Sequence, residues 1–215
     1  MTHFRNALVV GALILSLPLI AARAVVLPPI SDPPTGEYRP GKFVWIDLVT
    51  ADVAAAEKFY GGMFGWTFDR VGDGPARYTL AYQDGFPVAG IAARAPVPGT
   101  KGPQVRDSWW IAYMSVADVD RAAADVVARG GKTLIPARTL EGRGRMVVLA
   151  DPDGAPFGLV KSASGDPPDF RAEPGEWIWA VYQSADAGRA AAFYQDLGNY
   201  EVVPGDLVGN AASFD

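Results

Sequence analysis

The folded part of the chain opens with a pattern of hydrophobic and polar residues typical of a strand followed by a helix. Residues 43–50 (FVWIDLVT) are mainly β-branched or aromatic and lie between Gly41 and Asp52, which predicts a strand. Apolar residues then recur at helical spacing from Asp52, a suitable N-cap, until Gly65 ends the pattern. Turn residues divide the following stretch into three short expected strands, at residues 66–71, 77–83 and 86–95.

The same order of elements then occurs a second time. A strand is expected at residues 109–116 and an alanine-rich helix at residues 118–129. Three further strands are expected at residues 132–140, 145–150 and 156–161. The Asp-Pro-Asp-Gly sequence of residues 151–154 suits a type I turn and lacks the ligand number of a calcium loop. The pattern thus predicts two copies of one unit, a strand and a helix followed by three strands.

A third copy of the opening begins at Trp177. A shift of 134 residues superimposes, without a gap, Trp45 on Trp179, Asp52 on Asp186 and Phe59 on Phe193. We interpret residues 175–215 as a truncated second domain, joined by a linker at residues 164–174. The apolar face of its helix is expected either to dock on the first domain or to pair with another chain as a homodimer. That face comprises Ala190, Phe193, Tyr194 and Leu197.

The N-terminal residues have the pattern of a secretory signal peptide. Arg5 precedes an apolar run at residues 7–22, and Ala22-Arg23-Ala24 places small residues at the cleavage site. The run is shorter than the roughly 20 residues that span a bilayer. We therefore expect residues 1–24 to be removed and the protein to be periplasmic or secreted, with an uncleaved membrane anchor as the alternative. Residues 25–40 contain five prolines and are expected to form an extended tether.

Composition restricts the available chemistry. The chain has a formal charge of −5, which becomes −7 when Arg5 and Arg23 leave with the signal, so a nucleic-acid partner is not expected. It contains no cysteine, and its single histidine, His3, lies in the signal. A nucleophile activated by histidine is thereby excluded from the processed protein, and only Asp, Glu, Lys or Tyr could transfer protons.

Three segments together resemble one known superfamily. They read VWIDLVTADVAAAEKFYGGMFGWTF, WWIAYMSVADVDRAAADVVARGG and GRMVVLADPDGAPFGLV. The combination resembles the vicinal oxygen chelate superfamily of glyoxalases, bleomycin-resistance proteins and extradiol dioxygenases, and within it the glyoxalase-like antigen type. The resemblance covers residues 41–163 as one domain. It implies an α+β fold in which paired βαβββ modules form a curved eight-stranded sheet around a cleft, followed by an incomplete second copy.

The resemblance also implies four positions at which enzymes of the superfamily hold a divalent metal with histidine and glutamate. In this chain those positions are Trp45, Ile111, Gly158 and a residue near Ala92. Indole, isoleucine, glycine and alanine side chains provide no metal ligand. We therefore expect no metal, no other cofactor and no metal-dependent lyase or dioxygenase activity.

Side-chain alternation indicates which residues face the implied cleft. Trp45 and Asp47 share one face of their strand, and so do Trp109, Ile111 and Tyr113 on theirs. Asp47 could pair with Arg145 or Arg143 of the other module. Such a cleft suits a small apolar or aromatic ligand, although the same aromatic residues could simply fill it as core.

The sequence therefore favours an exported, non-catalytic small-molecule binding module. The expected ligand-binding residues are Trp45, Asp47, Trp109, Ile111, Tyr113 and Arg145, with no catalytic residue and no metal ligand. Two alternatives stay open. One is a metal-independent enzyme with Asp47 as base, and the other is a structural or interaction protein with a filled cleft.

Overall fold

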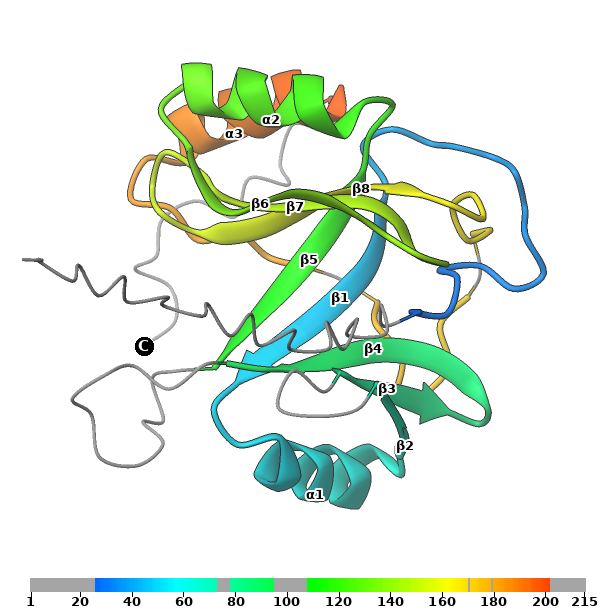
Figure 1. The fold of residues 1–215 in the computed structure, drawn as a ribbon. Helices are drawn as coiled ribbons and strands as arrows, with labels where there is room; N and C mark the ends of the chain where they lie inside the picture. Colours follow the sequence, from blue (N-terminus) through cyan, green and yellow to red (C-terminus); the bar gives the residue numbers. More distant parts are fainter. Residues whose placement is uncertain (1–25, 73–77, 95–107, 170, 179, 202–215) are drawn as a thin grey trace, which may run out of the picture.

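One curved sheet organises the protein (Figure 1). The computed structural model describes residues 26–72, 78–94, 108–169, 171–178 and 180–201, and all statements below concern these residues. Within them the strand order is β2-β3-β4-β1-β5-β8-β7-β6. The first module comprises β1 (Phe43–Thr50), α1 (Val53–Phe64), β2 (Thr67–Val71), β3 (Tyr78–Gln83) and β4 (Phe86–Ala93). The second comprises β5 (Trp109–Ser115), α2 (Val119–Ala128), β6 (Lys132–Leu140), β7 (Gly144–Ala150) and β8 (Pro156–Ser162).

The expected α+β fold of two paired modules is confirmed, and each expected strand and helix of both modules is present. Local signals explain the agreement at the helix ends. The Asp52 side chain accepts a hydrogen bond from the Ala55 amide at 2.9 Å, and Gly65 ends α1 in the left-handed conformation with φ 74°. Asp118 caps α2 in the same way.

The two modules join at the centre of the sheet through the antiparallel pair β1 and β5. Trp45 lies opposite Tyr113, and Asp47 lies opposite Ile111. On their other edges β1 pairs with β4 and β5 with β8, both in parallel. This register places Gly90 of β4 beside Asp47 and Gly158 of β8 beside Tyr113. The central residues of β4, β1, β5 and β8 therefore lie side by side in the middle of the sheet.

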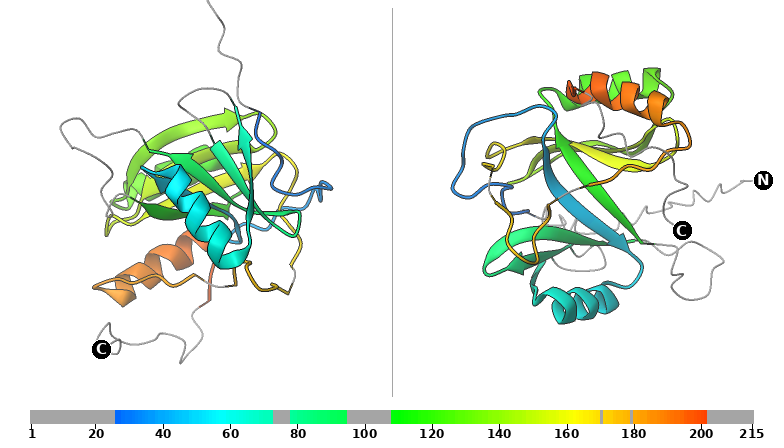
Figure 2. Two further views of the ribbon diagram at one scale, coloured as in Figure 1. Left: turned by 90° about the horizontal axis from the view of Figure 1, so that it is seen from below. Right: turned by 180° about the vertical axis from the view of Figure 1, so that it is seen from behind.

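Helices cover the outside of the curved sheet (Figures 1 and 2). α1 lies outside the first module, while α2 lies outside the second with α3 (Ala187–Gly198) beside it. Phe193 of α3 is buried in a cluster that includes Val126 of α2 and Phe157 of β8. The apolar face of α3 therefore packs on the domain formed by the two modules of the same chain, one of the two outcomes expected from the sequence.

The Asp-Pro-Asp-Gly turn anchors the segment that leads into α3. The turn forms as expected, with the Gly154 amide donating to the Asp151 carbonyl at 3.0 Å. Its carboxylates then accept hydrogen bonds from the tail, Asp151 from the Tyr194 hydroxyl at 2.9 Å and Asp153 from Ser184 at 2.5 Å. The strand expected before α3 is not formed at residues 171–178 or 180–186.

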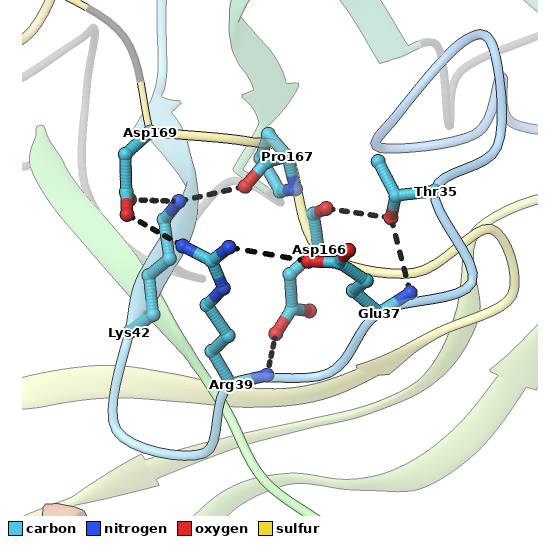
Figure 3. A network of polar contacts seen from close by, with 7 residues as sticks. All are labelled: Thr35, Glu37, Arg39, Lys42, Asp166, Pro167 and Asp169. Atoms are coloured by element: carbon cyan, nitrogen blue, oxygen red, sulfur yellow. Dashed lines mark hydrogen bonds and ion pairs between the residues drawn. The ribbon is translucent and has the colours of Figure 1, made fainter.

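Residues 26–40, expected as an extended tether, have neither helix nor strand but pack against the domain. Leu27 and Ile30 are buried, and the Leu27 amide donates to the Glu141 carbonyl at 3.0 Å. Further along, a polar network joins the segment to the residues after β8 (Figure 3). Its members are Thr35, Glu37, Arg39, Lys42, Asp166, Pro167 and Asp169.

Many hydrogen bonds of this network use backbone amides and carbonyls that are not paired within a helix or a strand. The Arg39 amide donates to the Asp166 carboxylate at 2.6 Å, and the Asp166 amide donates to the Glu37 carbonyl at 2.7 Å. Lys42 bridges the Pro167 carbonyl and the Asp169 carboxylate, each at 2.6 Å. The segment is thus fixed at both ends, at residue 27 and at residues 35–42. The expected signal at residues 1–24 lies outside the described residues, and none of the described helices is long and apolar enough to span a bilayer.

Candidate ligand site in the cleft

A buried carboxylate lies at the centre of the sheet. Asp47 is only 7% exposed, and its Oδ1 accepts hydrogen bonds from Trp45 Nε1 at 2.7 Å and from the Tyr78 hydroxyl at 2.5 Å. Burial raises the pKa of Asp47, because the charged form loses its hydration. Hydrogen bonds from Tyr78 and Trp45 and the charge of Arg143 oppose that rise without cancelling it.

A buried guanidinium lies beside this carboxylate. The Arg143 side chain is 1% exposed, and its Cζ lies 4.0 Å from the centroid of the Trp45 ring, a cation–π contact. None of its three nitrogens, Nε, Nη1 and Nη2, has a hydrogen-bond partner among the described residues. Arginine has five N–H donors and keeps its charge at any physiological pH, so a buried charge here has no hydrogen-bonded partner among the described residues.

Two phenols complete the polar centre. Burial raises the pKa of both Tyr78 and Tyr113 well above the usual value, and the charge of Asp47 raises each further. Both hydroxyls therefore remain protonated and act as donors near neutral pH. Around them, a buried apolar cluster includes Leu80, Met146 and Ile30.

The residues at the implied metal positions do not fit a metal. A Cβ added at Gly158 would lie 2.0 Å from Cδ1 of Tyr113, and one added at Gly90 would lie 2.2 Å from Oδ1 of Asp47. The phenol of Tyr78 also occupies the space above Gly90. The register makes Gly90, rather than the residue near Ala92, the counterpart of Gly158. At the four positions where the superfamily resemblance implies metal ligands, this chain has one tryptophan, one isoleucine and two glycines, namely Trp45, Ile111, Gly90 and Gly158.

A chelating group elsewhere in the cleft would need several donor side chains. No group of three or more Asp, Glu, His or Cys residues suited to a metal exists within the described ranges. Asp47 alone supplies one carboxylate, and its Oδ1 already accepts two hydrogen bonds. One carboxylate does not make a transition-metal site.

Four of the six expected ligand-binding residues meet at one buried place in the centre of the sheet. Trp45, Ile111 and Tyr113 belong to one buried cluster, and Asp47 is hydrogen-bonded to the first of them. Trp109 is outside this cluster, because it is 43% exposed at the start of β5, with the Arg94 guanidinium over its ring at 4.9 Å.

Arg145 does not reach the cleft. Its Nε and Nη2 contact the Asp120 carboxylate of α2 at 2.7 and 2.6 Å, on the helix-covered side of the sheet. In a regular strand Arg143 would share that side, since the two residues are two positions apart. Gly144 instead adopts φ 110°, which turns Arg143 toward Trp45. The two glycines that flank Arg143 could have indicated an irregular backbone here, but the sequence does not reveal that their φ angles are positive.

Tyr78 is the site residue that the sequence interpretation missed. It begins β3, and alternation places it on the same face as Leu80 and Tyr82. Which face of β3 looks into the cleft is decided by pairing with β4, where Tyr78 lies opposite Ala92. That pairing was not available from the residue pattern.

Comparison with known proteins agrees with this fold. The sequence model of the Glyoxalase/Bleomycin resistance protein/Dioxygenase superfamily matches residues 42–159. A protein of Mycobacterium tuberculosis named "Putative glyoxylase CFP32" is 36% identical over 165 residues, covering 76% of this chain and 62% of the relative. The anthracycline biosynthesis protein DnrV of Streptomyces peucetius is 33% identical over 165 residues, covering 73% of this chain and 60% of the relative. The chain thus spans less than two thirds of the length of these relatives.

A solved structure gives the same result at the level of fold. The Mn(II)-bound glyoxalase of Novosphingobium aromaticivorans has a TM-score of 0.51 and 17% sequence identity, covering 76% of this chain and 54% of that one. At that identity the likeness concerns the fold alone.

Proposed function

Because the chain belongs to the Glyoxalase/Bleomycin resistance protein/Dioxygenase superfamily, we propose that it uses the cleft of this fold to bind a small organic molecule without metal chemistry. The observation that carries the proposal is the buried centre formed by Asp47, Trp45 and Tyr78. Ligand sites are typically apolar and aromatic with a few fixed polar groups, and this centre has that composition.

The geometry supports binding over base catalysis by Asp47. A general base must be ionised and must reach the proton that it removes. Asp47 is 7% exposed, and its Oδ1 already accepts hydrogen bonds from Trp45 and Tyr78, so it does not reach a substrate proton in this arrangement. The processed chain has no histidine or cysteine that could replace it.

A filled cleft is the second candidate, favoured by how completely the aromatic residues are covered. Trp45 is 8% exposed and Tyr113 is 5% exposed, and Ile30 of the N-terminal segment packs in the same cluster. In that case the cleft side chains contribute stability alone, and the protein acts through its surfaces.

Ligand-observed NMR with a panel of small planar compounds, neutral and anionic, tests the proposal on the full processed chain. We expect at least one compound to bind the wild type and to lose affinity in Trp45→Phe, which removes the indole donor but keeps a ring. Trp109→Phe is the matched control, because Trp109 is exposed and outside the cluster. A panel in which no binding responds to Trp45→Phe would favour the filled cleft.

Elemental analysis of the same preparation tests the absence of metal chemistry. We expect no stoichiometric zinc, nickel, iron or manganese, because Trp45, Gly90 and Gly158 provide no ligands. One tightly held metal ion per chain, lost in Asp47→Asn, would overturn the proposal.

We also propose that the protein acts outside the cytoplasmic membrane, after cleavage following Ala24. The support is the signal pattern of residues 1–24. Mass mapping of the N-terminus in envelope and medium fractions should find Val25 as the first residue. An intact Met1 in the membrane fraction would favour the anchored alternative.

A further inference from the structure

We propose that the ligand of this cleft carries a carboxylate and that Arg143 is the residue that binds it. The inference rests on the proposed function, since it names the class of molecule that the same cleft accepts. It starts from one observation that the binding proposal does not use, the buried guanidinium with no hydrogen-bond partner among the described residues.

The buried guanidinium of Arg143 is expected to bind a hydrogen-bonding partner. Nearly all buried polar groups in proteins are hydrogen-bonded, and a buried charge without a partner is costly. Arg143 has Trp45 on one face at 4.0 Å, which leaves the N–H edges of the guanidinium unsatisfied. Stacking on an indole fixes the plane of the guanidinium, so its donors are already oriented for a ligand.

Asp47 is the nearest candidate partner, but it does not take that place. Its Oδ1 is bound by Trp45 and Tyr78, and it forms no ion pair with Arg143. Because the hydrogen bonds to Asp47 Oδ1 come from Trp45 and Tyr78, the N–H donors of Arg143 stay available to an incoming anion.

The chemistry of a single guanidinium favours a carboxylate over a phosphate. A carboxylate is planar and carries one negative charge, and it accepts two parallel hydrogen bonds from the arginine fork. A phosphate dianion needs further cationic groups, and the neighbouring arginine, Arg145 of β7, contacts Asp120 of α2 instead. A planar ring attached to the carboxylate would find aromatic neighbours in Trp45 and Tyr113.

The N-terminal segment covers this site. The Leu27 carbonyl packs against Gly142, the neighbour of Arg143, and the Leu27 amide bonds to Glu141. Ile30 packs in the same cluster as Trp45. Since Arg143 is 1% exposed, a ligand reaches it when the hydrogen bond between Leu27 and Glu141 breaks and residues 27–33 move away from the turn between β6 and β7, while residues 35–42 stay attached.

Benzoate and benzamide form a matched pair of probes, because they share one ring and differ in charge. We expect benzoate to bind the full processed chain and benzamide to bind at least tenfold more weakly. Arg143→Met keeps a long side chain over Trp45 and removes the charge, and we expect it to weaken benzoate about ten- to hundredfold, the usual size of a charge-assisted hydrogen-bond pair. Arg145→Gln is the control and should leave benzoate affinity unchanged.

The stability of the ligand-free variants separates a binding arginine from a structural one. Arg143→Met removes an unsatisfied charge, so its urea unfolding midpoint should equal or exceed that of the wild type. A lower midpoint would show that Arg143 stabilises the ligand-free fold through contacts such as the one with Trp45, and it would overturn the proposal. Deuterium uptake at residues 27–33 should rise when benzoate binds, and binding without such a rise would overturn the entry route.

The two proposals can fail separately. If neutral planar compounds bind in a manner sensitive to Trp45→Phe while benzoate has no preference, the cleft binds ligands but Arg143 does not select a carboxylate. If inorganic phosphate competes with benzoate at equal concentration, the site takes anions in general and the carboxylate assignment is wrong. If no compound binds, the binding function itself fails.

Discussion

Phe59 and Phe193 hold the same position in two helices 134 residues apart, yet Phe59 is 54% exposed and Phe193 is 7% exposed. The helices correspond at this shift from the N-cap aspartates, Asp52 and Asp186, to the left-handed C-cap residues. The two helices differ in what packs against them. The ring of Phe193 meets Phe157 at 6.3 Å, edge to face, whereas α1 has no buried residue.

This difference predicts opposite sensitivities at equivalent positions. Phe193→Ala should lower the free energy of unfolding by about 3 kcal/mol, the usual cost of truncating a buried phenylalanine. Phe59→Ala should change it by less than about 1 kcal/mol. Urea denaturation measures both, and limited proteolysis should cut residues 171–186 faster in Phe193→Ala alone. Equal effects at the two positions would show that α3 does not dock on α2 in solution.

Asp47 should make the protein less stable as pH rises. Burial raises the pKa of Asp47 in the folded protein above its ordinary value, so between the two pKa values the folded protein binds more protons at this site than the unfolded chain. The contribution of Asp47 to the free energy of unfolding is therefore largest below the unfolded pKa and falls as pH rises through the folded pKa. Asp47→Asn removes this dependence and still lets Trp45 and Tyr78 donate to an oxygen.

Urea denaturation at pH 3.5, 5 and 7 checks this sign. The stability of Asp47→Asn relative to the wild type should improve as pH rises. Asp120→Asn is a control with the opposite sign, because Arg145 lowers the pKa of Asp120 and that stabilisation is present only at higher pH. A parallel trend in the two variants would contradict the burial of Asp47.

Trp45 and Trp109, both expected in the cleft, should differ in what their removal costs. Trp45 is buried, donates to Asp47 and stacks on Arg143, so Trp45→Ala should destabilise the fold by about 3–5 kcal/mol. Trp109 is 43% exposed, and Trp109→Ala should cost less than about 1 kcal/mol. Thermal and urea unfolding provide the comparison, and similar losses would place Trp109 in the same core as Trp45.

Two glycines should respond in opposite directions to one added methyl group. Gly158→Ala places a Cβ 2.0 Å from the Tyr113 ring, and overpacking of this kind costs about 1–3 kcal/mol. Gly62→Ala lies in α1 with open space around its Cβ, and it should stabilise the helix by about 0.5–1 kcal/mol. If Gly158→Ala were neutral, the Tyr113 ring would have room to leave the space above Gly158.

The architecture could be predicted from sequence because its signals are local. Alternation within strands, the capping residues Asp52 and Asp118, and glycine turns all act over a few residues. The site was predictable only where regular alternation holds, as for Trp45 and Asp47. Arg145, the arginine expected to bind ligand, contacts α2, and Arg143 lies beside Trp45 instead, because Gly144 breaks that alternation. The host of α3 depended on contacts between residues far apart in the chain, so the sequence left docking and dimerisation as open alternatives.

The glycines at the centre of the sheet restrict which single substitutions this cleft can accept. A glutamate at Gly90 would collide with Tyr78 and Asp47, and one at Gly158 would collide with Tyr113. A chelating carboxylate therefore becomes tolerable only after a phenol has been replaced by something smaller. Replacing one of these tyrosines alone leaves a void in the core and adds no metal ligand. A single substitution therefore does not convert this site into a chelating one, because each new carboxylate requires a second change that removes a ring.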